Sequence, residues 1–422
     1  RQKVMLLAPT GRAAKVFSLG SGAPAYTIHR RIYREKAFAG VDGQFGLNDN
    51  LYTDTLFMVD EASMIANMGL GGTTFGSGCL LDDLVKFVYQ GHNDRLLLIG
   101  DKAQLPPVGE EESPALSASV MEGYGLKVYE CDLNEVLRQS QSSGILYNAT
   151  LIRQMITHDA VTGLPLIRFK GFADIVMLPG AELVESLGDS YHHVGMDETM
   201  VITRSNKRAN IYNNGIRNMV LDREEELSSG DMLMIVKNNY FWTEKEKKES
   251  GEGSAGAVPA FLANGDRAKV LRVSNYIELY GFRFATLLLQ LPDYDDYEMQ
   301  VTGMLDTLQS EAPALTHEQQ EELFRQVEED YQHFVPLKAD RMKSIRQDAY
   351  FNALQIKYAY AVTCHKAQGG QWAHVYVDQG YMTDDMLTPD YIHWLYTAFT
   401  RATDKLFLVN WPKEQTCEPT DL

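Results

Sequence analysis

The stretch Thr55-Leu56-Phe57-Met58-Val59-Asp60-Glu61-Ala62-Ser63 decides the fold class of this chain. Its apolar run predicts a buried strand, and that strand ends in two adjacent carboxylates. Similar apolar runs occur at residues 4–8, 96–100 and 128–131, and small or polar residues follow each run. Such runs are typical of a parallel sheet covered on both faces, in which the functional loops follow the carboxyl ends of the strands. The sequence therefore predicts an α/β fold with its chemistry at one edge of a parallel sheet.

The composition limits the class of protein. The 422 residues suggest about two to four domains. The chain is 45% hydrophobic and 23% charged, as in ordinary globular proteins, and it has no run of about 18 apolar residues, so we expect no membrane span. Its four cysteines are far apart and form no C-x-x-C, which argues against a disulfide framework or a zinc site. A reducing cytoplasm is the expected compartment.

The net charge of −18 bears on possible partners. Proteins that hold nucleic acid through phosphate neutralisation alone usually carry a basic excess. An acidic protein can still grip a strand through backbone amides and a few hydroxyl groups. The charge therefore argues against a simple basic binding module, but it allows a protein that repeatedly releases and rebinds a strand.

Asp60 and Glu61 are the candidate catalytic carboxylates. At a strand end, Asp60 can coordinate Mg²⁺ while Glu61 polarises an attacking water. The alternative is a solvated acidic pair at a turn, but the apolar strand before them favours catalysis. Gln104, within G-D-K-A-Q-L-P-P-V-G at residues 100–109, follows another predicted strand and can sense a terminal phosphate.

Two arginines are candidates for the positive charge that phosphoryl transfer requires. An arginine finger raises such rates by about 10³ to 10⁵. Arg138 lies in L-N-E-V-L-R-Q and Arg401 in Y-T-A-F-T-R-A. Both are expected to complete an ATP site between two domains, and the alternative for each is a surface salt bridge.

The remaining pattern predicts two α/β units with insertions. Residues 33–54 contain two alternating stretches around a glycine-rich turn, which predicts a β-hairpin. A second α/β unit follows residue 140, with a strand at 200–203 and a helix at 207–219. A β-rich insertion at 231–290 contains a charged, glycine-rich stretch, 243–256, that is expected to be mobile. A helix from Thr316, with Gln319 three residues on, is expected to be capped and to pack through the apolar residues Leu323, Phe324, Val327, Tyr331 and Phe334.

Three further segments are candidates for nucleic-acid contacts. Residues 8–14, A-P-T-G-R-A-A, place a strand end beside a helix N-terminus, where Pro9, Thr10 and Gly11 can hold a strand phosphate. Residues 27–30 read T-I-H-R, and residues 360–372 read Y-A-V-T-C-H-K-A-Q-G-G-Q-W.

These blocks, in this order, resemble motifs Ia, II, III, IV, V and VI of superfamily 1 helicases, with the best matches in the RecD-like, 5′-to-3′ branch. The resemblance implies that Thr27 and His29 contact the strand, with His29 stacking on a base. It also implies that Thr363, His365 and Lys366 contact the nucleic acid, while Gln368 and Gly369 face the nucleotide. His29 could instead be a structural histidine. Gln371 stands where the family often has an acidic residue, so no ribose or base contact is assigned there.

The resemblance also implies an architecture and a function. It divides the chain into a first RecA-like domain (1–140) with the hairpin 33–54, a second RecA-like domain (141–228 and 351–422), and an SH3-like insertion (229–350). The implied protein is an ATP- and Mg²⁺-dependent DNA helicase or translocase of DNA repair or recombination. Its partners would be single-stranded DNA and junctions between single- and double-stranded DNA.

One family element is absent from the printed sequence. None of the 33 glycines is followed by lysine, so the chain contains no G-x-x-x-x-G-K-[ST] phosphate loop. We expect the first domain to be N-terminally truncated, with the loop in a preceding segment. Without that loop the chain should be nearly inert as an ATPase.

Two other functions stay open from the sequence. The chain could be a superfamily 1 motor directed to RNA, because stacking and phosphate contacts do not identify the sugar. It could also be a non-catalytic nucleic-acid-binding subunit, although Asp60, Glu61, Gln104 and Arg401 would then have no use together.

Overall fold

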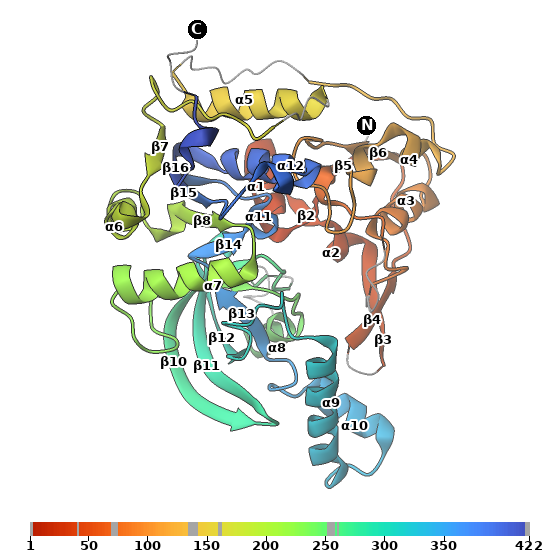
Figure 1. Cartoon of the computed structure of the whole chain (residues 1–422). Helices are drawn as coiled ribbons and strands as arrows, with labels where there is room; N and C mark the ends of the chain where they lie inside the picture. Colours follow the sequence, from red (N-terminus) through yellow and green to blue (C-terminus); the bar gives the residue numbers. More distant parts are fainter. Residues whose placement is uncertain are drawn as a thin grey trace. The chain divides into compact units, whose positions relative to one another are not determined.

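The computed structural model describes residues 3–39, 42–68, 75–133, 142–158, 163–250, 258–259 and 261–417. Contacts group the chain into two compact units (Figure 1). Unit 1 comprises Arg1–Asp60, Asn67–Leu98 and Glu225–Ala359, and unit 2 comprises Glu61–Ala66, Ile99–Glu224 and Tyr360–Leu422. Each unit contains one parallel sheet, as the apolar runs predict.

The sheet of unit 1 has four parallel strands in the order β2-β1-β5-β6. Their bounds are β1 Lys3–Ala8, β2 Ala25–Thr27, β5 Thr55–Val59 and β6 Arg95–Leu98. Met5 pairs with Phe57, and Phe57 pairs with Leu96, so one apolar row crosses the middle of the sheet. Phe57 and Val59 are fully buried, in agreement with the buried strand expected before Asp60.

Helices cover this sheet unevenly. Helix α1 (Gly11–Ser21) packs Ala13 and Ala14 against Ala8, and α3 (Leu80–Gln90) buries the apolar face that begins at Leu81. On the face that carries Leu6 and Met58, however, Val4 is 55% exposed and Leu97 is 41% exposed. Among the described residues helices therefore lie on both faces of the sheet, as expected, but the face that α1 covers is left partly exposed at Val4 and Leu97.

The predicted hairpin is present in unit 1. Strands β3 (Tyr33–Ala39) and β4 (Asp42–Leu47) pair antiparallel, after the short helix α2 (Ile28–Ile32). The aromatic ring of Phe45 stacks on Phe75 at 4.7 Å and lies 5.1 Å from the ring of Tyr240. The hairpin thus packs against other parts of unit 1 through aromatic side chains.

Unit 1 also contains a closed five-stranded barrel in the order β10-β11-β12-β13-β9. Its strands are β9 Met232–Ile235, β10 Arg267–Leu279, β11 Phe282–Leu291, β12 Tyr297–Met304 and β13 Leu354–Tyr358. The β-rich region therefore extends beyond the expected 231–290, because β13 joins the barrel after a helical excursion. Within the stretch 243–256, whose mobility stays a prediction, the helix α8 (Phe241–Ser250) continues to Ser250.

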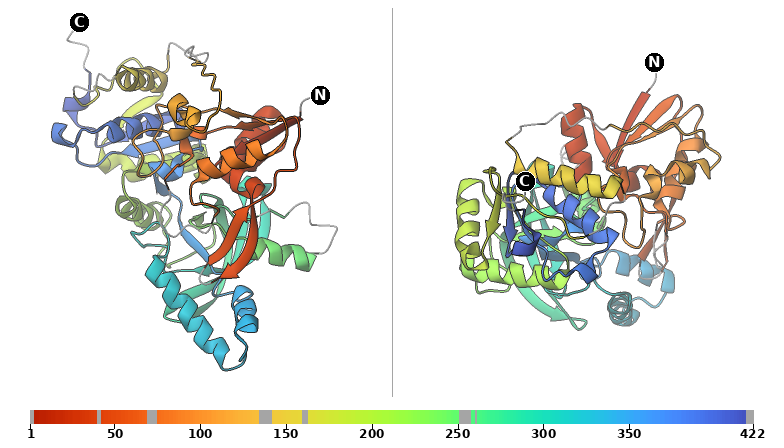
Figure 2. Two further views of the ribbon diagram at one scale, coloured as in Figure 1. Left: turned by 90° about the vertical axis from the view of Figure 1, so that its right-hand side faces the viewer. Right: turned by 45° about the horizontal axis from the view of Figure 1, so that its top comes forward.

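The excursion between β12 and β13 consists of α9 (His317–Gln332) and α10 (Lys338–Arg346), which lie side by side (Figure 2). Thr316 and Gln319 form the predicted capping box. Leu323 and Val327 are buried against Phe284 of the barrel, as expected. Phe334 lies beyond the helix end and is exposed, so its assignment to the packed face is wrong.

Unit 2 has a five-stranded parallel sheet in the order β14-β8-β15-β16-β7. The strands are β7 Ile175–Leu178, β8 Thr199–Thr203, β14 Ala361–Thr363, β15 Trp372–Asp378 and β16 Ala402–Val409. The helices are α4 Ala118–Glu122, α5 Gly144–Thr157, α6 Leu183–His193, α7 Asn206–Gly215, α11 Cys364–Ala367 and α12 Pro389–Phe399. The expected helix 207–219 changes to a π-helix at Ile216–Val220, and the strand expected at 128–131 is not formed.

The predicted fold class, two parallel α/β sheets with a hairpin and a β-rich insertion, is confirmed. All four cysteines are free thiols. Among the helices of the described residues, none is both long and apolar enough to cross a bilayer.

Candidate nucleotide and strand sites

Asp60 and Glu61 lie where β5 ends in a sharp turn. The Asp60 amide donates to the Leu7 carbonyl at 3.0 Å, which holds the end of β5 beside β1. Glu61 has a φ of 52°, an uncommon conformation for a residue other than glycine or asparagine. Such backbone strain is often found at functional sites. Both carboxylates are half-buried.

The loop after β6 packs against the turn that follows Glu61, within unit 2. A side chain on Gly100 would bring a Cβ to 2.9 Å from the Ser63 amide nitrogen and 3.0 Å from Leu116 Cδ1. Only glycine therefore fits at this close approach. The Oε1 atom of Gln104 is buried and has no hydrogen-bond partner among the described residues. A buried, unpaired acceptor is costly, so this atom fits a role in binding a polar ligand.

Leu105 connects the loop at 100–109 to two other quoted segments of unit 2, the one that contains Gln368 and the one that contains Thr397. Its amide donates to Thr397 Oγ1 at 2.8 Å, and its carbonyl accepts from Gln368 Nε2 at 2.8 Å. His393 Nδ1 lies 2.9 Å from the Ala103 carbonyl oxygen. The loop at 100–109 is thus held from both sides, by α12 and by the residue after α11.

Arg401 is 4% exposed and forms hydrogen bonds inside unit 2. Its guanidinium donates to the carbonyl oxygens of Thr397 and Gly370, each at 3.0 Å, and to Thr400 Oγ1 at 3.1 Å. In this structure it therefore links the end of α12 to the loop after α11. Arg138, the other predicted arginine finger, lies outside the described residues.

Gln368 and Gly369, the predicted nucleotide-facing residues, follow the short helix α11. Gln368 is buried and uses its amide to bind the Leu105 carbonyl. Gly369 has a φ of 73°, in the left-handed region that favours glycine. Gly369 therefore permits the turn that brings Gln368 to the loop.

A triad that the sequence did not reveal strengthens this arrangement. Arg153, from α5, donates to Asp101 Oδ1 at 2.7 Å and to the Tyr396 hydroxyl oxygen at 3.0 Å. The Tyr396 hydroxyl donates to Asp101 Oδ2 at 2.6 Å. Burial, with Asp101 nearby, raises the pKa of Tyr396 to about 12, so the hydroxyl keeps its proton. Asp101 and Tyr396 belong to quoted motifs, but no sequence signal pointed to Arg153.

The predicted strand-binding residues are divided between the two units. Within unit 1, Thr10 caps α1, where its Oγ1 accepts from the Ala13 amide at 3.2 Å, and Pro9 and Gly11 flank it. Thr27 caps α2 in the same manner, accepting from the Arg30 amide at 3.3 Å. Each threonine therefore satisfies one amide at a helix N-terminus, and contact with a strand phosphate stays a prediction.

His29 lies in an aromatic cluster. Its ring centroid is 5.6 Å from that of Tyr33 and 5.1 Å from that of Phe75. Burial lowers the pKa of His29 to about 4, so the ring is neutral at pH 7. Packing therefore accounts for part of its surface, and base stacking stays a prediction.

Within unit 2, Thr363, His365 and Lys366 form one short segment. Thr363 ends β14 and precedes α11, with its side chain half-buried. His365 is exposed, and Lys366 is half-buried. The segment thus presents polar groups at the carboxyl end of a parallel strand, where binding loops usually lie.

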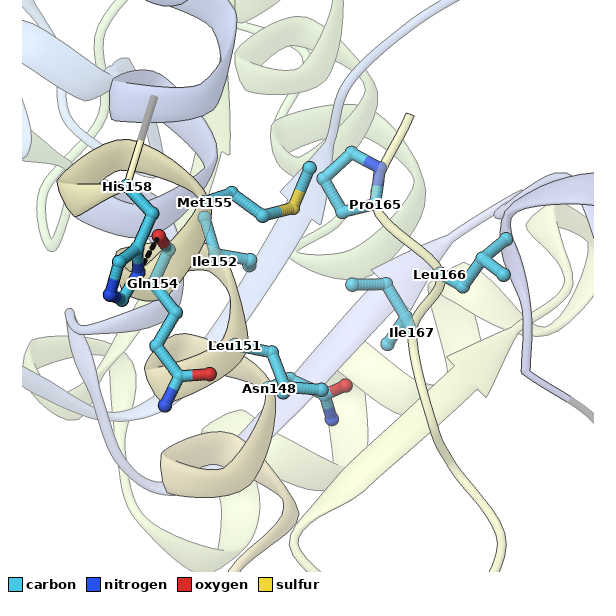
Figure 3. A pocket seen from close by; sticks show the side chains of 9 residues that line it. All are labelled: Asn148, Leu151, Ile152, Gln154, Met155, His158, Pro165, Leu166 and Ile167. Carbon is cyan, nitrogen blue, oxygen red and sulfur yellow. Dashed lines mark hydrogen bonds between the residues drawn. The ribbon is translucent and has the colours of Figure 1, made fainter. Parts of the chain in front are cut away.

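A pocket of about 420 Å³ lies elsewhere in unit 2, beside α5 (Figure 3). It is lined by Asn148, Leu151, Ile152, Gln154, Met155, His158, Pro165, Leu166 and Ile167. None of the predicted site residues lines it. In the described part of the chain, no group of three or more His, Cys, Asp or Glu side chains is placed to hold a metal ion.

Two parts of the chain match models of known protein families. Residues 358–409 match the UvrD-like helicase C-terminal domain, and residues 1–163 match an AAA domain. The first range contains Thr363 and Arg401, and the second contains Asp60, Glu61 and Gln104. These matches support a superfamily 1 helicase, and they do not distinguish its RecD-like branch.

Comparison with individual proteins gives more distant likenesses. The chain is 22% identical over 396 residues to an uncharacterised protein of Acanthamoeba polyphaga mimivirus, covering 83% of this chain and 74% of that protein. Among solved structures, it is similar to Pif1 helicase from Bacteroides in complex with ADP-AlF3 and ssDNA (13% identity, TM-score 0.46, 99% of this chain and 85% of that chain). It is also similar to Pif1 helicase from Candida albicans (15%, TM-score 0.39, 99% and 86%). At these TM-scores the likeness by itself decides neither fold nor function.

Proposed function

We propose that this chain is the motor region of an ATP-dependent superfamily 1 DNA helicase or translocase of the RecD-like branch, acting on single-stranded DNA in repair or recombination. The observation that carries the proposal is Leu105, whose amide and carbonyl are bound by Thr397 and Gln368. Hydrogen bonds of this kind can carry a change at a phosphate-sensing loop to the segments that bind the strand. Free thiols at all four cysteines support a reducing compartment such as the cytoplasm.

The proposed roles in ATP hydrolysis follow from side-chain chemistry. Asp60 supplies the one carboxylate that Mg²⁺ needs when it is otherwise bound by phosphates and water. Mg²⁺, when bound, neutralises charge on the phosphates. Glu61 takes the proton of the attacking water, and Gln104 accepts a hydrogen bond from that water through its unpaired Oε1. Arg138 and Arg401 are the proposed arginine fingers, which requires Arg401 to exchange at least one internal hydrogen bond for a phosphate.

ATP hydrolysis also needs a phosphate loop, which the printed 422 residues do not contain. We propose that polypeptide outside these residues provides it. The exposed apolar side chains of Val4 and Leu97 support this, because parallel sheets are normally covered on both faces. A helix packed there would place its preceding loop at the carboxyl end of the strands, near Asp60.

The proposed strand site uses Pro9, Thr10, Gly11, Thr27, His29, Thr363, His365 and Lys366. Helix N-termini capped by Thr10 and Thr27 suit phosphate, and they let an acidic chain bind nucleic acid. The hairpin β3–β4 is proposed as the wedge at junctions of single- and double-stranded DNA, and the closed barrel is proposed to be SH3-like.

Strand binding can be tested on the chain as it is. Fluorescence anisotropy with labelled DNA and RNA of equal length and sequence should show tighter binding of DNA. His29→Ala should weaken binding by about 1 to 3 kcal/mol, the size of one stacking contact. His92→Ala, an exposed histidine of the same unit, is the control and should bind normally. Tighter binding of RNA would favour the RNA-directed motor, and no binding of either would refute the proposal.

ATP hydrolysis is tested on a polypeptide that includes a phosphate loop. Glu61→Gln should abolish DNA-stimulated turnover while ATP binding persists, because only activation of the water is lost. Glu112→Gln, an exposed carboxylate of unit 2, should hydrolyse ATP at the parent rate. Turnover by Glu61→Gln at the parent rate would show that the base is another group. Binding of DNA without any hydrolysis would favour the non-catalytic subunit.

A further inference from the structure

The carboxylate of Asp266 is buried against the N-terminus of α1, within unit 1. Asp266 is 1% exposed. Its Oδ2 accepts hydrogen bonds from the Ala263 amide at 2.7 Å and the Tyr294 hydroxyl at 2.6 Å. Its Oδ1 has no hydrogen-bond partner among the described residues. A Cβ on Gly11 would come 2.7 Å from this Oδ1, so the unpaired oxygen faces the first residue of the helix.

The charged groups around Asp266 come from four elements. Helix α1 contributes Arg12 and Lys15, and Lys15 Nζ donates to the Pro292 carbonyl at 2.9 Å. The short helix Pro292–Tyr294 contributes Asp293 and Tyr294. Strand β10 contributes Arg267, whose guanidinium nitrogen lies 3.8 Å from Asp293 Oδ1. Helix α2 contributes Arg30, whose charge acts on Tyr294. Burial raises the pKa of Asp266 to about 7. The hydrogen bonds from Tyr294 and Ala263 act to lower this pKa, and the nearby charge of Asp293 acts to raise it. The carboxyl group therefore changes charge near neutral pH.

We propose that Asp266 and a phosphate of the bound strand share the N-terminus of α1, so that strand binding is coupled to protonation of Asp266. This inference rests on the proposed strand site at Thr10 and Gly11. A helix N-terminus carries only about half a positive charge. Two anions within a few ångströms of it, one of them buried, repel each other strongly. Uptake of a proton by Asp266 removes this repulsion.

The direction of the pH dependence follows from the linkage between strand binding and proton binding at Asp266. A phosphate beside Asp266 raises the pKa of the carboxyl group further, so the complex holds more protons than the free protein. Strand affinity should therefore be highest at low pH and fall as the pH rises through 7. If the phosphate raises this pKa from about 7 by about one unit, the Kd should increase about fivefold between pH 6 and pH 8. His29, with a pKa near 4, stays neutral over this range.

The test is an anisotropy titration of a labelled oligothymidylate at pH 6, 7 and 8 and constant ionic strength. The unaltered chain should show the rise in Kd, and Asp266→Asn should show a flatter profile with tighter binding at pH 8. Asp293→Asn, which removes the neighbouring carboxylate, should keep the dependence but shift it to lower pH. Circular dichroism and thermal melting establish that each variant is folded.

Calorimetry gives a second readout that needs no variant. Titration of the chain at pH 7, in buffers of different ionisation enthalpy, should show net proton uptake on strand binding. Zero or negative uptake, or equal pH profiles for the unaltered chain and Asp266→Asn, would overturn the inference while leaving the strand site in place. Absence of binding at every pH would instead remove the proposed function and the inference together.

Discussion

At the scale of single residues, burial changes what a side chain can do. His29 and Asp266 both look like ordinary polar residues in the sequence. In the structure, burial moves the pKa of the first to about 4 and that of the second to about 7. The neutral forms of both residues are favoured because a charge in a poorly solvated site is costly. Their roles therefore depend on surroundings that the sequence does not display.

The lowered pKa of His29 predicts how stability depends on pH. Above pH 6.5 the histidine is neutral in folded and unfolded chains alike. As the pH falls from 6.5 toward 4, the unfolded chain binds a proton that the folded chain excludes, so stability decreases. Between pH 7 and pH 5 this should cost about 1 to 2 kcal/mol. Urea unfolding at pH 7 and pH 5 measures this loss. The free energy of unfolding of the unaltered chain should fall by about 1 to 2 kcal/mol more than that of His29→Gln.

Exposed His92 provides the matched control, since His92→Gln should lose as much stability between pH 7 and pH 5 as the unaltered chain. An equal loss for His29→Gln would mean that the His29 ring is accessible to protons in the folded state. It would then be free to stack on a base without any rearrangement.

At the scale of elements, the loop at 100–109 has no regular structure but is firmly attached. Hydrogen bonds at Leu105, Ala103 and Asp101 bind it to α12, to α5 and to the turn after α11. Gly100 lets the loop approach the turn that follows Glu61. The part of the loop that carries Gln104 is thus held on both sides of that residue, at Ala103 and Leu105, so we expect it to move together with α12 when a ligand binds Gln104.

Thr397→Val tests this attachment. Valine has nearly the same shape but leaves the Leu105 amide without its acceptor, and Thr397 is fully buried. An unsatisfied buried amide should cost about 1 to 3 kcal/mol in the free energy of unfolding. Thr397→Ser keeps the hydroxyl and should cost less. Hydrogen exchange at the Leu105 amide should become faster only in the valine variant, and unchanged exchange there would show that the bond does not hold the loop.

At the scale of the whole molecule, the net charge of −18 limits how the chain can hold a strand. The proposed contacts are mainly helix N-termini, hydroxyl groups and rings, and Lys366 is the lysine among them. Each cation that neutralises a phosphate of a single strand adds about 0.7 to the salt slope. We therefore expect log Kd to vary with log salt concentration with a slope of only about 1 to 2.

Titrations of single-stranded DNA between about 50 and 200 mM salt measure this slope. Lys366→Gln should lower it by about 0.7, and Lys413→Gln, an exposed lysine of unit 2, should leave it unchanged. A slope near 5 would reveal a basic surface that the proposed site does not include.

The sequence alone determined those strands, caps and turns that depend on residues close together in the chain. The apolar run before Asp60, the capping box at Thr316 and the alternating hairpin were all predictable, because period, caps and turns act over a few residues. Local pattern failed where the partner was decisive. The residues at 128–131 have strand-like composition but no partner strand. The charged stretch after Thr243 continues the helix α8, whose buried Trp242 donates to the distant Asn352 carbonyl oxygen at 2.9 Å.

Only the tertiary structure decided how the site is assembled. The residues Leu105 and Thr397 are 292 positions apart, and Asp266 meets Gly11 from the barrel insertion. No periodicity connects such pairs, because they come together only when distant strands and helices pack. The sequence therefore determined which chemical groups the chain offers and which strands and helices carry them. Packing determined which of those groups meet, and burial determined their charge.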